Sequence, residues 1–139
     1  MSEWTFRDYL RPLGRNGGVE LVNDILEWTL NQPKKAQAKM DMIILSLQAS
    51  PVWPPQYISA LTGWPNILEL RVSSFGAEYR PLGCHGPERR EFTLLRGSIE
   101  KGGKLPRADC QTATDRRKRV FEGWPTCEHE FTRSDSRKA

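Results

Sequence analysis

Apolar residues recur with helical spacing in two successive segments of the first half of the chain. In residues 19–32 the i, i+3, i+4, i+7 positions are occupied by Val22, Ile25, Leu26 and Thr29. In residues 34–50 one helical face collects Ala36, Met40, Ile43, Ile44 and Leu47. This spacing is typical of amphipathic helices. The first helix should end before Pro33 and the second before the prolines at 51, 54 and 55, because proline does not continue a helix.

A change of period after residue 66 indicates β-structure. Apolar and charged residues alternate in the segment LELRV, which is typical of a strand with one buried face. Three strands are predicted, at Ile67–Val72, Tyr79–Leu82 and Glu91–Arg96. The first two form a hairpin around SSFGAE, where Gly76 can adopt a positive φ. The third, EFTLLR, alternates less cleanly, as a central strand does.

The remaining segments complete an α+β prediction. Residues 1–18 fit either a short strand or a lead-in segment, with Pro12 and the Gly17–Gly18 pair ending it, and residues 107–121 fit a helix. Residues 50–66 should be a loop whose apolar side chains cover the core: Trp53, Tyr57, Ile58, Leu61 and Trp64. We expect a small antiparallel sheet, with two N-terminal helices and a C-terminal helix packed on one side. The domain spans residues 1–121, and residues 122–139 form a tail whose end, SDSRKA, should be disordered.

Charge is unevenly distributed along the chain. Its length of 139 residues is typical of one domain. Residues 71–119 hold 12 basic and 6 acidic side chains, whereas residues 1–70 hold 6 and 7. A basic segment of this kind favours an acidic partner, either nucleic acid or an acidic protein segment. A solvated surface without a partner is the alternative.

The cysteines and the absence of cofactor motifs narrow the class of protein further. Three cysteines without a CxxC pair, and a polar start without a signal peptide, predict a cytoplasmic protein with reduced thiols. No apolar run is long enough to span a membrane. A zinc site from Cys84, His85, Cys127 and His129 fits no known finger spacing. No nucleotide loop or cofactor fingerprint is present, so no cofactor or metal is expected.

Five short blocks follow one another along the chain: Leu61 with Glu69–Leu70–Arg71, Tyr79–Arg80, Leu94–Leu95 with Gly97 and Lys101, Lys104–Leu105–Pro106, and Ala113 with Arg117. Their order and spacing resemble the RelE/ParE superfamily of bacterial toxins, and most closely its HigB-like, phage-derived branch. The resemblance covers roughly residues 18–120. The chain departs from the family pattern in several places: Ser98 replaces an aromatic residue, Glu100 replaces a lysine, Pro81 follows Arg80, and Asn66 stands where a glycine is expected.

The resemblance implies the toxin of a type II toxin–antitoxin system that cleaves mRNA on the ribosome without a metal. Its partners would be a small helix-turn-helix antitoxin, the ribosome and mRNA, and no membrane. Such a site must move protons and stabilise the charge on a phosphorane. Arg80 would grip the scissile phosphate with Arg71 beside it. Lys101 would add positive charge, and His85 is the candidate base. Further RNA contacts are predicted at Lys104, Arg96, Arg116, Arg117, Lys118 and Arg119.

Other interpretations stay open at this point. The two arginines could instead pair with Glu69, Glu78 or Glu91. The RRKR run at 116–119 could simply place cations at a helix end, where the helix dipole favours them. The same superfamily also contains ParE-type inhibitors of DNA gyrase. Finally, the substitutions at Ser98, Glu100 and Pro81 are compatible with an inactive, phage-derived binding module.

Overall fold

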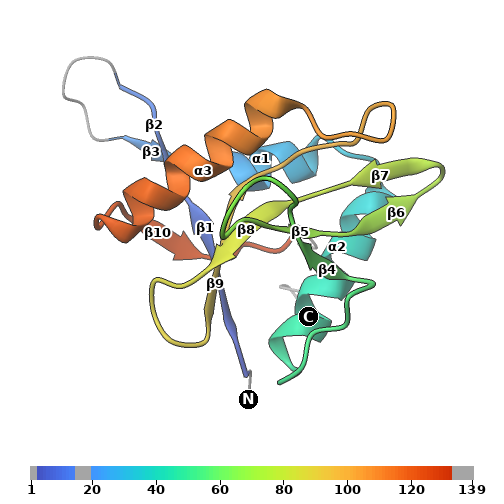
Figure 1. Cartoon of the computed structure of the whole chain (residues 1–139), viewed down its shortest axis with the longest axis horizontal. Coiled ribbons are helices and arrows are strands. Elements are labelled where there is room, and N and C mark those ends of the chain that lie inside the picture. Colours follow the sequence, from blue (N-terminus) through green and yellow to red (C-terminus); the bar gives the residue numbers. More distant parts are fainter. Residues whose placement is uncertain (1–2, 15–19, 133–139) are drawn as a thin grey trace.

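The computed structural model describes residues 3–14 and 20–132, which fold into an α+β domain (Figure 1). The helices are α1 (Asp24–Leu30), α2 (Lys34–Gln48) and α3 (Arg107–Phe121). The strands are β1 (Thr5–Tyr9), β2 (Arg11–Pro12), β3 (Leu21–Val22), β4 (Ile58–Ala60), β5 (Leu68–Leu70), β6 (Val72–Ser74), β7 (Ala77–Tyr79), β8 (Leu82–His85), β9 (Glu91–Arg96) and β10 (Thr126–Glu128).

The main sheet is mixed rather than antiparallel, which corrects the sequence prediction. Its six strands follow the order β10-β1-β9-β8-β5-β4. β1 runs parallel to β9, with Phe6 opposite Phe92, and the other pairs are antiparallel. The sequence left β1 ambiguous and missed β4 and β10. No local turn signal predicts the parallel pair, because it joins segments more than 80 residues apart in the sequence.

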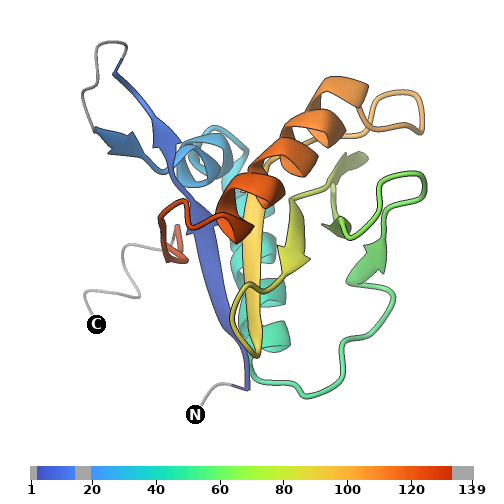
Figure 2. The ribbon, with the colours of Figure 1, turned by 60° about the vertical axis from the view of Figure 1, so that its left-hand side comes forward.

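Helices cover both faces of this sheet, not one face as predicted (Figure 2). One core cluster joins α1, α2 and one sheet face, and includes Phe6, Ile25, Met40, Phe92 and Leu94. The other joins α3 to the opposite face, and includes Tyr9, Leu82, Leu95, Ala113 and Val120. Residues 92–95 of β9 are therefore all buried, which confirms the expectation of a central strand.

The helices match their predicted positions except at the start of α1. The five apolar positions predicted for α2 are all buried: Ala36, Met40, Ile43, Ile44 and Leu47. α1 begins at Asp24, later than predicted, because Leu21–Val22 pair with Arg11–Pro12. The Asn23 side chain then accepts a hydrogen bond from the Leu26 N–H (3.0 Å) and caps the first turn.

The predicted hairpin is interrupted at both arginines. β5 ends at Leu70 and β6 begins at Val72, while β7 ends at Tyr79 and β8 begins at Leu82. β6 pairs with β7 as a separate two-stranded ribbon, whereas β5 and β8 belong to the main sheet. Pro81, which lacks a backbone N–H, lies in the second gap, and its carbonyl accepts from the Leu70 N–H (2.8 Å). The hairpin therefore bends where Arg71 and Arg80 lie.

Residues 122–132, predicted as part of a tail, contribute to the sheet. β10 pairs with β1, and the His129 N–H donates to the carbonyl of Phe6 (2.9 Å). Further on, the Thr132 hydroxyl donates to the buried carboxylate of Asp41 (2.7 Å). The predicted disorder of SDSRKA and the predicted break at Gly17–Gly18 lie outside the described residues. No helix within the described ranges has the length and hydropathy that a bilayer crossing requires.

Candidate functional site

The bend in the hairpin brings Arg71 and Arg80 to one carboxylate, that of Glu69. Arg71 Nη1 lies 2.8 Å from Glu69 Oε2, and Arg80 Nε lies 3.7 Å from Glu69 Oε1. The backbone N–H groups of the two arginines donate to other segments, at Tyr57 and Ser98. The two arginines thus share one patch, but Glu69 lies between them.

Arg80 is buried among carboxylates instead of facing solvent. Its side chain is only 3% exposed, and its Nη2 lies 2.9 Å from Glu78 Oε1 and 2.8 Å from Glu100 Oε2. With Glu69, three carboxylates surround this one guanidinium. Because a phosphate would have to displace these anions, this arrangement argues against Arg80 as the direct phosphate grip. The alternative pairing with Glu69 and Glu78 is present, and Glu91 instead approaches Arg7 (3.9 Å).

An open cleft lies beside this cluster, between the β4–β5 edge and the segment that leads into α3. Its walls include Glu69, Arg71, Glu100 and Lys104, so cations and carboxylates face the same space. Lys104 is exposed and forms no ion pair with another described residue. Arg107, at the start of α3, lies over the ring of Trp64 (5.2 Å) at the rim. The cleft can therefore offer positive charge from Arg71 and Lys104 and a proton acceptor from a carboxylate.

A tight turn connects Lys104 to Lys101. The Lys101 N–H donates to the carbonyl of Lys104 (2.7 Å), and the Lys104 N–H donates back (3.2 Å). Lys101 is exposed, but it lines a second cavity together with Arg96 instead of the cleft. Arg96 Nε lies 2.9 Å from Asp109 Oδ1. The structure thus separates Lys101 and Arg96 from the two clustered arginines.

His85 lies away from the arginines, at the opposite end of β8. With about 3.3 Å per strand residue, five residues separate it from Arg80 by roughly 16 Å. His85 stacks on Trp53 (5.4 Å between ring centres) and contacts Trp4 (5.2 Å). Burial lowers its pKa, because the imidazolium loses solvation. The structure therefore does not bring the predicted base to the predicted phosphate grip.

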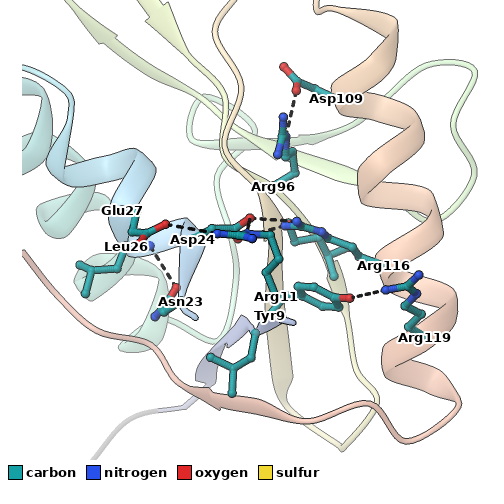
Figure 3. A network of polar contacts seen from close by, with 12 residues as sticks. Tyr9, Arg11, Asn23, Asp24, Leu26, Glu27, Arg96, Asp109, Arg116 and Arg119 are labelled. Atoms are coloured by element: carbon teal, nitrogen blue, oxygen red, sulfur yellow. Dashed lines mark hydrogen bonds and ion pairs between the residues drawn. The ribbon is translucent and has the colours of Figure 1, made fainter. Parts of the chain in front are cut away.

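The basic run of α3 divides into buried and exposed residues. Arg116 is buried, where it donates to both oxygens of Asp24 (3.0 and 2.8 Å) and to the carbonyl of Leu95 (2.9 Å), as Figure 3 shows in part. This correction removes it from the predicted RNA contacts, since it holds α3 against α1 and β9. Arg117 lies over Phe121 (4.4 Å), and Arg119 donates to the Tyr9 hydroxyl (3.3 Å). Lys118 and Arg119 are exposed.

The thiols and histidines do not form a metal site. The described part of the chain contains no group of three His, Cys, Asp or Glu residues that could hold a metal ion. β9 and β1 separate Cys84 and His85 on β8 from Cys127 on β10. All three cysteines are free, and burial raises the pKa of Cys84 to about 12 and that of Cys127 to about 11. Thiols with such pKa values are poor nucleophiles near neutral pH.

Sequence reasoning missed the carboxylates as site residues. Glu69 and Glu100 line the cleft, whereas the sequence indicates Glu69 only as an arginine partner and Glu100 only as a departure from the family motif. The substitution at Glu100 was a usable signal, because an acid replaces an expected lysine beside two cations. Trp28 and Asp109, which line the second cavity, carried no such signal.

The described residues thus form an α+β domain with a charged cleft beside its sheet. Residues 27–118 match the family described as Phage derived protein Gp49-like (DUF891), and the chain therefore belongs to that family. Gp49-like proteins are a phage-derived, RelE/toxin-like family. No curated protein and no solved structure matches the chain significantly.

Proposed function

We propose that this protein is the HigB-like toxin of a type II toxin–antitoxin system and that it cleaves mRNA on the ribosome. Membership of a RelE/toxin-like family supports the toxin assignment. The cleft supports the RNase assignment, because one open space is lined by two cations and two carboxylates, namely Arg71, Lys104, Glu69 and Glu100. This juxtaposition of cations and carboxylates is the observation that carries the proposal.

The cleft residues divide the chemistry between them. Arg71 and Lys104 bind the scissile phosphate and stabilise the charge of the phosphorane. Glu100, whose side chain is 22% exposed, accepts the 2′-hydroxyl proton as the 2′-oxygen attacks phosphorus. The bond to the 5′-oxygen then breaks, and the Lys104 ammonium protonates that oxygen. Arg80 acts as a positioning residue, because its buried guanidinium pairs with Glu69, Glu78 and Glu100 and fixes their carboxylates.

The proposed partners follow from this role. A cognate antitoxin, expected to be a small helix-turn-helix protein, would inhibit the toxin, and the ribosome would present the mRNA. The proposed toxin requires neither a cofactor nor a membrane, and it acts in the cytoplasm.

Primer extension on an mRNA induced together with the protein tests the nuclease. We expect discrete cuts within translated codons, which disappear in Glu100→Gln and weaken at least tenfold in Lys104→Ala. Lys34→Ala is the matched control, because Lys34 is an exposed lysine on α2, away from the cleft. Equal cutting by the wild type and Glu100→Gln would exclude Glu100 as the base. Absence of cuts despite growth arrest would exclude the nuclease.

One observation favours a second candidate, a catalytically inactive binding module. Around Arg71 and Arg80, three carboxylates face two guanidinium groups, so this cluster has no excess positive charge. A module of this kind would neither cut mRNA nor arrest growth. If growth stops without cuts, a supercoiling assay identifies the ParE-type alternative, since only that activity would inhibit DNA gyrase.

A further inference from the structure

A second cavity lies on the other side of the Lys101–Lys104 turn from the cleft. It encloses about 250 Å³ between α1, the end of β9 and the start of α3. The aromatic and charged side chains that line it are those of Trp28, Arg96, Lys101, Asp24 and Asp109. The volume is slightly below that of typical drug-sized sites and suits a fragment the size of one nucleotide.

Both carboxylates of this cavity are already neutralised by partners. Asp109 accepts from Arg96 Nε (2.9 Å) and from the Ser98 hydroxyl (2.6 Å). Asp24 accepts from both Nη atoms of Arg116 and lies 3.3 Å from Arg11 Nε, as shown in Figure 3. They therefore repel an incoming anion much less than free carboxylates would.

The cations of the cavity, in contrast, keep donors free. Arg96 uses Nε for Asp109, and its two Nη atoms donate to no other described residue. The Lys101 ammonium is exposed and forms no ion pair within the described ranges. A guanidinium fork and an ammonium on one wall form a donor set suited to a phosphate group.

An aromatic wall stands beside these donors. The Trp28 indole packs against the backbone at Gly97 so closely that an added Cβ would lie 2.0 Å from it. The Tyr79 ring makes an edge-to-face contact with the same indole (6.5 Å between ring centres). The indole is thus fixed by packing, and it is half-buried with part of its surface toward the cavity. A fixed aromatic surface next to phosphate donors is how single-stranded RNA is commonly held.

We propose that this cavity binds one nucleotide of single-stranded RNA. The phosphate lies on Arg96 and Lys101, and the base packs against Trp28. The assignment of RNA as the molecule that supplies this nucleotide rests on the proposed function. Because the cleft and the cavity flank one short turn, the bound nucleotide neighbours the scissile phosphate, and the cavity contributes to the choice of cleavage site.

Titration of the isolated protein with small probes tests this site, with the Trp28 indole N–H signal as the NMR readout. We expect 5′-GMP and 5′-UMP to shift this signal and to bind about tenfold more tightly than ribose 5-phosphate, which lacks the stacking base. Lys101→Ala should weaken nucleotide binding about tenfold. Lys34→Ala, which removes an exposed lysine elsewhere, should not change it.

Two outcomes would overturn the inference. Equal binding of nucleotides and ribose 5-phosphate would exclude the base contact with Trp28. Unchanged nucleotide affinity in Lys101→Ala would exclude the phosphate contact. Trp28→Phe provides a second check that keeps the fold, because it shortens the aromatic surface without emptying the site, and it should weaken nucleotides but not inorganic phosphate.

The titration can be separated from the cleavage assay. Nucleotide binding that depends on Lys101, without any mRNA cuts, would support the cavity and refute the nuclease. Cuts without such binding would support the nuclease and refute the cavity.

Discussion

At the scale of single residues, Arg80 shows how burial changes the meaning of a motif. A Tyr–Arg pair beside Glu–Leu–Arg suggests two cations that grip one phosphate. The structure instead gives Arg80 three carboxylate neighbours and 3% side-chain exposure. The guanidinium therefore organises the acids of the cleft. Loss of function in an Arg80 variant would follow from misplaced carboxylates as readily as from a lost phosphate contact.

Arg80→Ala should destabilise the fold substantially. The change leaves Glu78 and Glu100 without their arginine and Glu69 with only Arg71 and the Ser59 hydroxyl, and removing one member of a buried charge cluster typically costs about 3–5 kcal/mol. We expect a decrease of about 3 kcal/mol in the free energy of unfolding, measured by urea denaturation followed by circular dichroism. Arg89→Ala, at an exposed arginine, should stay within about 0.5 kcal/mol of wild type. An Arg80→Ala protein as stable as wild type would contradict the structural role.

At the scale of elements, the β6–β7 ribbon depends on side-chain contacts across its two short strands. Ser73 and Glu78 are cross-strand partners, and the Ser73 hydroxyl donates to Glu78 Oε1 (2.5 Å). Arg80 Nη2 donates to the same oxygen (2.9 Å). These hydrogen bonds, first from Ser73 and then from Arg80, lower the pKa of Glu78 because they favour its ionised form.

This lowered pKa predicts acid-sensitive stability. Because the folded-state pKa of Glu78 lies below its unfolded value, its contribution is present above that value and is lost as pH falls through the lower folded value. The stability difference between wild type and Glu78→Gln should therefore be constant near neutral pH and shrink as the pH falls below the ordinary glutamate pKa of about 4.3 in urea titrations. Ser73→Ala should reproduce part of this change. A difference that does not vary with pH would contradict the assignment.

At the scale of the whole molecule, the C-terminal segment adds the edge strand of the main sheet next to β1. β10 pairs with β1, and beyond it His129 Nδ1 lies 2.8 Å from Asp8 Oδ1. Thr132 supplies the hydrogen bonds to Asp41, which is 2% exposed. Asp8 and Asp41 are thus buried carboxylates whose partners arrive from the end of the chain, so the segment stabilises the fold.

Truncation after Glu122 should therefore destabilise the domain. It uncovers the edge of β1 and leaves Asp41 and Asp8 buried with fewer partners, which we expect to lower the free energy of unfolding by at least about 3 kcal/mol. Chemical denaturation of both truncated chains measures this effect. A chain that ends at Thr132 is the control, because it keeps every contact described above. Equal stability of the shorter chain and the full chain would show that the C-terminal segment is dispensable for stability.

Local patterns in the sequence predicted the helices best. The apolar face of α2 and the span of α3 follow from periodicity and prolines within one short window. The same local signals predicted β9 as a central strand. They could not predict that β1 lies parallel to β9 or that a strand ends before Arg71, since these features depend on pairing with distant segments. The break at Arg80, in contrast, has a local signal in Pro81, which lacks a backbone N–H.

The sequence by itself determined the composition of the site and the location of its basic segment. It placed Arg71, Arg80, Lys101 and Lys104 within one stretch and carried the motifs of a toxin-like family. Only the tertiary structure decided which of these cations are free. Arg80 is surrounded by three carboxylates and Arg116 is buried against Asp24, whereas Lys101 and Lys104 remain exposed. The physical reason is that a charge is available to a ligand according to its burial and its neighbours, and both arise from contacts between distant parts of the chain.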